Sequence, residues 1–106
     1  MGQVGGASVE RFGDVEVDIN ARTVKRRGDR VELTPKEFDL LVALIRRRGA
    51  VATRLELLKA VWGHRAEVMT RTVDIHIAEL RRKLEDDASE PRHIITVWKA
   101  GYRLER

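Results

Sequence analysis

The segment RTVDIHIAELRRKL, residues 71–84, has the spacing of an amphipathic helix. Its large apolar residues recur every three or four positions and form one stripe, which predicts burial against a core. They are Val73, Ile77, Leu80 and Leu84. The opposite face is polar except for Ile75, which stands among Thr72, Glu79, Arg82 and Lys83. A single exposed isoleucine is ordinary on a solvated face, so the elements around this helix must decide whether the face has a function.

Two shorter helices are predicted upstream from their first and last residues. TPKE (34–37) and TRLE (53–56) have the spacing of a capping box, and the proline suits the first position of a helix. Gly49 and Gly63 are expected at the C-terminal ends of these helices, and Thr70 is expected to cap the helix that follows. The predicted buried stripes are Phe38, Leu41, Leu44 and Ile45 in the first helix, and Leu55, Leu58, Val61 and Trp62 in the second.

Short strands are predicted on both sides of the helices. Residues 15–19 alternate apolar and acidic side chains, as a half-buried strand does. Two hairpins with a glycine in the turn are also predicted: residues 23–27 with 30–33 around Gly28–Asp29, and residues 94–97 with 102–104 around 99–101. This order predicts an α+β fold, a winged helix-turn-helix with an N-terminal antiparallel sheet, three helices and a C-terminal β-hairpin wing, over residues 9–106. Residues 1–8 are rich in glycine and are expected to be a flexible linker or an artificial extension.

Composition limits the possible functions. The 106 residues suffice for one domain, and the absence of cysteine excludes a disulfide framework and thiolate metal sites. No apolar run approaches the roughly 20 residues that span a bilayer, and the N-terminus lacks an apolar signal core, so a cytoplasmic protein without membrane contact is expected. The formal charge of +4 and the pI of about 10 suggest a polyanionic partner. The three histidines, His64, His76 and His93, lack metal-ligand spacing, and no catalytic motif is present, so neither an enzyme nor a cofactor is predicted.

Four motifs occur in a specific order: LTPKEFDLL (33–41), LLKAVWG (57–63), RTVDIHIAELRRKLE (71–85) and GYRL (101–104). From about Phe12 to Leu104 the chain resembles the DNA-binding effector domain of OmpR/PhoB-type response regulators. The resemblance implies a four-stranded N-terminal sheet, one strand more than the residues alone predict. It also implies sequence-specific binding of double-stranded DNA by a bacterial transcriptional regulator of the two-component type.

The same resemblance implies several partners. Family members usually carry a receiver domain, phosphorylated by a sensor kinase in a phosphorelay, and this chain is expected to be an excised effector domain or a natural protein without that half. Binding as pairs to tandem half-sites is implied, and the free domain is expected to be monomeric. The loop 64–69 corresponds to a segment that can contact RNA polymerase in the family. For Val68 and Met69, packing beneath the third helix is expected instead.

The candidate DNA-binding residues lie at the end of the second helix, on the third helix and on the hairpin. In the third helix, Ile75 is expected against a thymine methyl and Glu79 as an acceptor from cytosine N4. Its arginines are expected to contact phosphates or guanine, and His76 to donate to a phosphate. The complete set is Trp62, Arg71, Thr72, Ile75, His76, Glu79, Arg81, Arg82, Thr96, Trp98, Lys99 and Tyr102.

Two departures from the family pattern affect the predicted interface. Ala78 and Glu79 stand where some relatives place two basic residues, which predicts weaker non-specific binding and a different base preference. The hairpin reads VWKAGY where the family often has V-R-G-x-G-Y, so Trp98 takes an arginine position and Lys99 a glycine position. Lys99 is therefore expected in a turn conformation that glycine adopts more easily.

Alternatives remain open at several positions. Trp98 can pack under the hairpin, lie against sugar and phosphate, or contact a protein. Tyr102 can bind the DNA backbone or be a half-buried hairpin residue, and Trp62 can be part of the core, donate to a phosphate, or do both. The run Arg46–Arg48 is expected to be solvated charge at a helix end, far from the outer face of the third helix. A winged-helix module that binds proteins is the alternative function.

Overall fold

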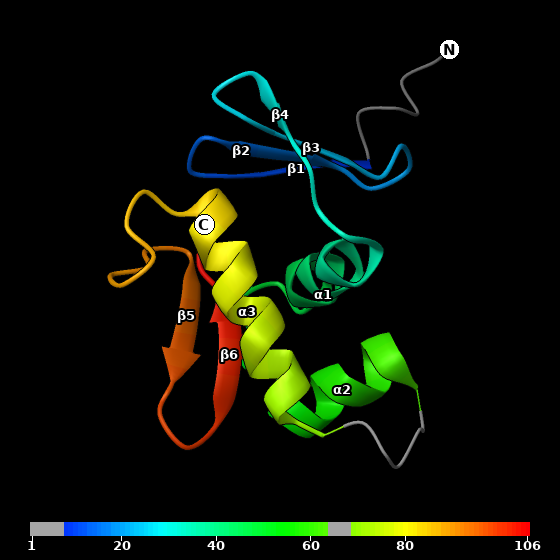
Figure 1. The fold of residues 1–106 in the computed structure, drawn as a ribbon, viewed down its shortest axis with the longest axis vertical. Helices are drawn as coiled ribbons and strands as arrows, with labels where there is room; N and C mark the ends of the chain where they lie inside the picture. Colours follow the sequence, from blue (N-terminus) through cyan, green and yellow to red (C-terminus); the bar gives the residue numbers. More distant parts are fainter. Residues whose placement is uncertain (1–7, 64–68) are drawn as a thin grey trace.

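The fold is known from a computed structural model, which describes residues 8–63 and 69–106. A four-stranded antiparallel sheet is followed by three helices and a two-stranded hairpin (Figure 1). The strands are β1 (Val9–Phe12), β2 (Val15–Asp18), β3 (Thr23–Arg26), β4 (Asp29–Val31), β5 (Ile94–Val97) and β6 (Gly101–Leu104). The helices are α1 (Pro35–Arg46), α2 (Arg54–Trp62) and α3 (Arg71–Leu84). Within the described ranges, no helix has the length and apolarity needed to cross a membrane.

The N-terminal sheet is a meander in the order β1-β2-β3-β4, and it confirms the four strands that the resemblance implies. The alternation in β2 buries Val15 and Val17 as predicted. The turn between β3 and β4 is one residue earlier than predicted, because Arg26 pairs with Asp29 and leaves Arg27 and Gly28 as the central residues. Their φ angles of 53° and 85° are both positive, as the favoured two-residue hairpin turn requires.

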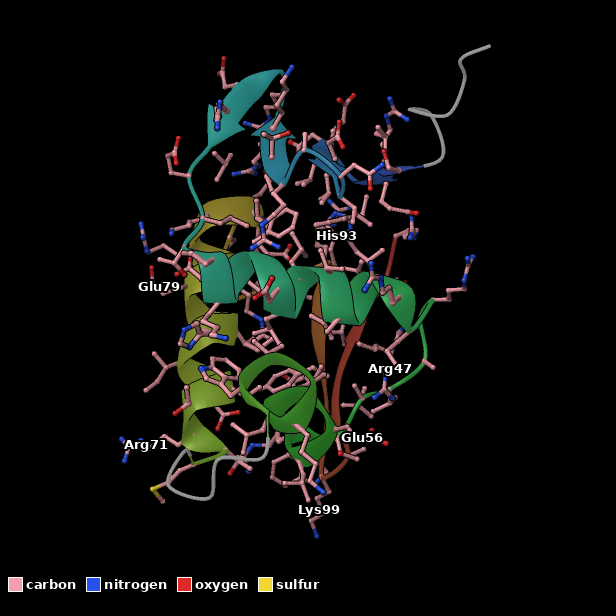
Figure 2. All side chains as sticks on the ribbon, turned by 90° about the vertical axis from the view of Figure 1, so that its right-hand side faces the viewer. Arg47, Glu56, Arg71, Glu79, His93 and Lys99 are labelled. Carbon is pink, nitrogen blue, oxygen red and sulfur yellow. The ribbon has the colours of Figure 1, made fainter. Side chains whose placement is uncertain are left out.

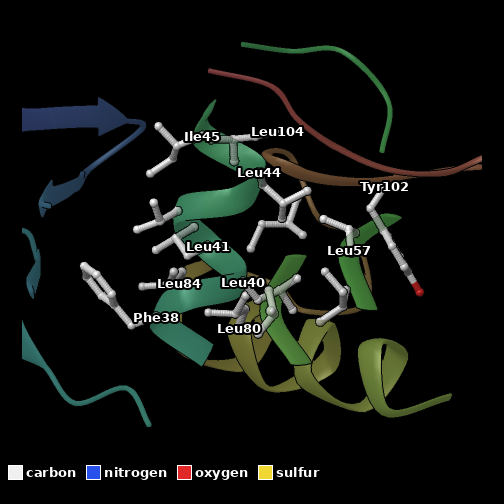
Figure 3. Close-up of a cluster of buried hydrophobic side chains, with 14 of the residues drawn as sticks. Phe38, Leu40, Leu41, Leu44, Ile45, Leu57, Leu80, Leu84, Tyr102 and Leu104 are labelled. Atoms are coloured by element: carbon white, nitrogen blue, oxygen red, sulfur yellow. The ribbon is translucent and has the colours of Figure 1, made fainter. Parts of the chain in front are cut away.

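Helix α1 lies between the sheet and the other helices and supplies much of the core (Figures 1 and 3). Its predicted capping box is confirmed: Thr34 Oγ1 accepts from the Glu37 N–H at 3.2 Å, and Glu37 Oε1 accepts from the Thr34 N–H at 2.9 Å. The predicted stripe is buried, and Leu40 and Val42 are buried beside it. Because α1 is apolar on more than one side, it can pack against α2, α3 and β6 and also face the sheet (Figure 1).

Helix α2 begins and ends as predicted, but its buried face was assigned partly wrongly. The Thr53–Glu56 capping box is present, and Gly63 follows the helix with a φ of 79°. Leu55, predicted to be buried, is 52% exposed, whereas Leu57 is fully buried. At 100° per residue, Leu55 lies about 160° away from Leu57 around the helix, so the two cannot share one face.

Helix α3 has the predicted bounds and buries the four residues of the predicted stripe. The predicted cap at Thr70 is wrong: its side chain makes no capping hydrogen bond, and its φ and ψ of −59° and −24° are helical. A capping side chain reaches the third N–H from an extended backbone, which Thr70 does not have. The Thr70 carbonyl instead accepts from Val73 and Asp74.

The hairpin β5–β6 is anchored at two places. Glu85, at the end of α3, is buried, and its carboxylate accepts from the N–H groups of Arg92, His93 and Ile94 at 2.7–3.0 Å. Ala52 adds a short third strand, because Ala52 and Tyr102 exchange backbone hydrogen bonds of 2.9 and 3.0 Å. These contacts place the hairpin beside α3 (Figure 1).

Candidate nucleic-acid interface

The outer face of α3, defined here as Arg71, Thr72, Ile75, Ala78, Glu79 and Arg82, points away from the core. Packing of the apolar stripe against α1 and α2 fixes this orientation. Arg71 and Glu79 project from the free side of the helix in Figure 2. Ile75 is 55% exposed, so the structure places it in solvent as the sequence predicts.

Glu79 and Arg82 form an ion pair across one turn of this face. Arg82 Nε and Nη2 both donate to Glu79 Oε1, at 3.1 and 2.8 Å. The hydrogen bond from Arg82 is the main cause that lowers the pKa of the Glu79 carboxyl, and the same bond raises the pKa of Arg82. Both groups are therefore charged at neutral pH, and their charges cancel in the middle of the outer face.

Two other basic residues of α3 point away from the outer face, and the sequence-based placement of one of them is wrong. Lys83, predicted on the outer face, turns toward α1, where its Nζ donates to Glu37 Oε1 at 2.6 Å. Arg81 turns toward the hairpin: Nε donates to the Ile94 carbonyl at 3.0 Å and Nη2 to Thr96 Oγ1 at 2.7 Å. Arg81 and Thr96 thus hold the hairpin against α3, and a phosphate contact by either residue stays a prediction.

His76 and Trp62 meet where α2 ends beside α3. Their rings pack edge to face with centroids 4.8 Å apart, and the half-buried Trp62 also packs against the core. His76 Nδ1 lies 2.8 Å from the Thr72 carbonyl, which can only accept, so Nδ1 carries a proton. Nε2 then remains for a phosphate, and it can donate only when the ring is the doubly protonated cation. The predicted phosphate contact of His76 is therefore limited to that form.

The tip of the hairpin is exposed. Trp98 is 82% exposed, which rules out the alternative that it packs under the hairpin. Lys99 has a φ of 63°, so the expectation of a conformation suited to glycine is confirmed. Figure 2 shows Lys99 at the extremity of the molecule. An aromatic ring and a cation are thus presented together at the tip.

Tyr102 belongs to a partly exposed hydrogen-bonded bridge that the sequence did not predict. Its hydroxyl donates to Asp74 Oδ1 at 2.6 Å, and Arg54 binds the same carboxylate through Nε at 3.1 Å and Nη2 at 2.6 Å. Burial, followed by the bond to Asp74, raises the pKa of Tyr102 to about 12. Tyr102 is buried and its one O–H is already used, so a phosphate contact through that proton would require breaking the bridge; contact of Tyr102 with the DNA backbone stays a prediction.

The bridge joins α2, α3 and β6 through residues far apart in the sequence. Neither Asp74 nor Arg54 is among the predicted site residues. The only local signal is that Asp74 adjoins the buried stripe, beside Val73, rather than lying on the outer face. A carboxylate next to the buried stripe is expected to contact a neighbouring element, but the sequence does not identify the residue that it contacts.

The remaining predicted features lie elsewhere. Arg47 pairs with Glu56 at 3.3 Å and is on the opposite side of the molecule from Arg71 and Glu79 (Figure 2), which confirms that the arginine run is remote from the outer face of α3. Met69 is 67% exposed, so its predicted packing beneath α3 is wrong. Residues 64–68, including Val68, lie outside the described residues.

Comparison with known proteins gives consistent matches. Residues 28–104 match the family described as "Transcriptional regulatory protein, C terminal". The DNA-binding response regulator MtrA of Mycolicibacterium smegmatis is 46% identical over 97 residues, which cover 92% of this chain and 42% of that protein. The chain therefore spans about two fifths of the length of this curated relative.

Two solved structures have the same arrangement of strands and helices. The response regulator DrrB, an OmpR/PhoB homologue from Thermotoga maritima, has a TM-score of 0.84 at 38% identity, covering 92% of this chain and 44% of that chain. The DNA-binding domain of Klebsiella pneumoniae RstA, in complex with the RstA box, has a TM-score of 0.80 at 38% identity, covering 91% and 95%. The predicted winged-helix fold is confirmed by these neighbours.

Proposed function

The chain belongs to the family of transcriptional regulatory protein C-terminal domains, and from this premise we propose that it binds double-stranded DNA sequence-specifically. In this proposal it is the effector domain of a regulator of the two-component type. Helix α3 enters the major groove, and the hairpin β5–β6 lies along the backbone or the minor groove. RstA, which shares the fold, has a structure in complex with a DNA box.

The observation that carries the proposal is the way α3 is held. One side of the helix is fixed by α1, α2 and the hairpin, while its outer face projects from the molecule without cover from any described residue (Figures 1 and 2). A helix with side chains is about 10–12 Å wide, close to the roughly 12 Å width of the major groove. Fourteen residues give α3 a length of about 21 Å, enough to reach across several base pairs.

Affinity and selectivity come from different residues in this arrangement. Arg71 at the start of α3 and Lys99 at the hairpin tip are exposed and suit phosphates, whose neutralisation releases counterions. Ile75, Glu79 and Arg82 occupy the part of the outer face that would lie against base edges. Trp98 can rest its ring on sugar and phosphate beside Lys99.

The partners beyond DNA form a second part of the proposal. A receiver domain elsewhere in the whole protein would bring two copies to tandem half-sites, and the domain by itself would be a monomer in the cytoplasm. Contact with RNA polymerase would use the loop 64–69, of which Met69 is exposed. Substitutions in that loop that left both DNA binding and activated transcription intact would remove the polymerase role.

A protein-interaction module is the second candidate, favoured by the 82% exposure of Trp98 and by the neutral Glu79–Arg82 pair. Fluorescence anisotropy with random duplex DNA in a salt series separates the two functions. DNA binding requires an affinity that falls steeply with salt, and no measurable binding at low salt would exclude it. Arg71→Ala should reduce the magnitude of the slope of log K against log salt by about 1. Arg46→Ala, on the exposed end of α1 away from α3, is the matched control and should leave the slope unchanged.

A further inference from the structure

The Glu79–Arg82 pair is a composite group that offers both kinds of hydrogen bond on one surface. Both of its hydrogen bonds end on Glu79 Oε1, and among the described residues no side chain or N–H donates to Glu79 Oε2. Arg82 keeps the N–H groups of Nη1 and one of Nη2 directed away from the carboxylate. A free acceptor therefore stands beside free donors, three residues apart on α3.

This combination matches one base pair better than the others. In the major groove, guanine presents the acceptors N7 and O6, and its partner cytosine presents the N4 amino group as a donor. An A·T pair also presents two acceptors and one amino donor, but its acceptors lie on either side of the amino group, so one guanidinium cannot bind both of them in parallel. From this match we infer that Glu79 and Arg82 together read a G·C base pair, with Arg82 on the guanine and Glu79 on the cytosine.

Ile75 sets the position of a second base. It lies four residues before Glu79, which corresponds to about 6 Å along the helix axis. With base pairs about 3.4 Å apart, this distance equals roughly two base-pair steps. Ala78, exposed beside Glu79, is too short to obstruct this approach. The half-site therefore contains a thymine, its methyl group against Ile75, within about two base pairs of the G·C pair.

The Glu79–Arg82 ion pair also disfavours binding to DNA sequences that lack the G·C pair. Where the G·C pair is absent, the free N–H groups of Arg82 do not meet the two adjacent acceptors of guanine, while the Glu79 carboxylate meets base acceptors that it cannot pair with. The same pair therefore reduces binding to unrelated DNA and favours the matching site. This inference rests on the proposed placement of α3 in the major groove.

Selection of bound duplexes from a random pool, followed by base-analogue substitution in the selected site, tests the inference. Replacing the thymine by uracil removes only the methyl group, and replacing the guanine by 7-deazaguanine removes only the N7 acceptor. Each change should weaken binding of the unchanged protein, by about 5- to 160-fold for the guanine, the range for loss of a good bidentate contact. Ile75→Ala should abolish the sensitivity to uracil and leave the sensitivity to 7-deazaguanine.

Two further variants test the pair itself. Glu79→Gln keeps the size of the side chain and removes its charge, and it should reduce the preference for G·C over A·T at the selected position. Arg82→Lys retains a cation but cannot make two parallel hydrogen bonds, so it should lose the response to 7-deazaguanine. Thermal unfolding of each variant verifies that α3 is folded, and Arg46→Ala serves as a control that should reproduce the parent specificity.

The possible outcomes distinguish a failure of the proposed DNA-binding function from a failure of this inference about base reading. No binding to any duplex at low salt would overturn the proposed function. Salt-dependent binding with a selected site that lacks the G·C pair, or an unchanged preference in the folded Glu79→Gln variant, would overturn this inference and leave DNA binding intact.

Discussion

Replacing Tyr102 by phenylalanine removes one hydroxyl and opens the bridge that joins the hairpin to α3. A hydrogen bond to a charged group contributes about 1.5–3 kcal/mol to stability. The lower part of this range applies, because Arg54 still donates two hydrogen bonds to Asp74 and keeps its carboxylate paired. The variant should thus lose about 1.5 kcal/mol of the free energy of unfolding at pH 7. For a domain of this size, the melting temperature should fall by roughly 6–10 °C.

The dependence of the free energy of unfolding on alkaline pH tests the same bridge in a second, independent way. The pKa of Tyr102 is raised to about 12 in the folded protein, against about 10 for an ordinary tyrosine. Between these values the unfolded chain loses the proton first, so it binds fewer protons than the folded state and the free energy of unfolding falls as pH rises. The stability linked to Tyr102 is fully present below pH 10 and is lost progressively up to pH 12. The loss is at most about 2.7 kcal/mol and is reduced by solvent screening near the surface.

The assay is direct because Tyr102 is the one tyrosine of the chain. The near-ultraviolet absorbance of tyrosinate reports its ionisation, and urea unfolding over a pH series reports the free energy. Tyr102→Phe should remove the tyrosinate signal and the part of the alkaline loss that belongs to it. Asp74→Asn should move the tyrosinate midpoint down toward 10. A midpoint near 10 in the folded parent protein, together with an unchanged melting temperature in Tyr102→Phe, would refute the bridge.

Three other substitutions probe separate contacts. Lys99→Gly should raise the free energy of unfolding by about 0.5–1 kcal/mol, because relief at the positive φ exceeds the added entropy of the unfolded chain; a lower melting temperature would contradict this. Lys83→Met leaves the buried Glu37 carboxylate without its cation and should cost about 3–5 kcal/mol in urea unfolding. His76→Ala should weaken DNA binding in fluorescence anisotropy, because it removes the ring nitrogen that is predicted to contact a phosphate; His93→Ala should leave the affinity unchanged.

The features that the sequence predicted correctly depend on residues close together in the chain. The capping boxes at Thr34 and Thr53 each involve residues three positions apart, and the stripe of α3 repeats within fourteen residues. The positive φ of Lys99 follows from the turn in which it stands. Local hydrogen bonds and helical periodicity are sufficient for such predictions.

The features that were missed or wrong depend on contacts between distant segments. Strand β1 carries one fully buried residue, Phe12, and is a strand because β2 pairs with it. Leu55 and Leu57 are both leucines in α2, and only the position of α1 decides which of them is buried. The inward turn of Lys83 requires Glu37, 46 positions earlier in the chain. None of these choices is encoded within a single helix or turn.

The distribution of cations shows why composition alone overstates the charge available to DNA. Helix α3 carries four basic residues, but Arg81 is engaged by the hairpin, Lys83 by Glu37, and Arg82 by Glu79. Cations held in such contacts can neutralise a phosphate and release counterions only if those contacts first break. The salt dependence of one domain should therefore correspond to about two to four phosphates, fewer than a count of basic residues on α3 and the hairpin suggests. Selectivity then depends more on the outer face of α3 than on total charge, and a neutral Glu79–Arg82 pair is consistent with that balance.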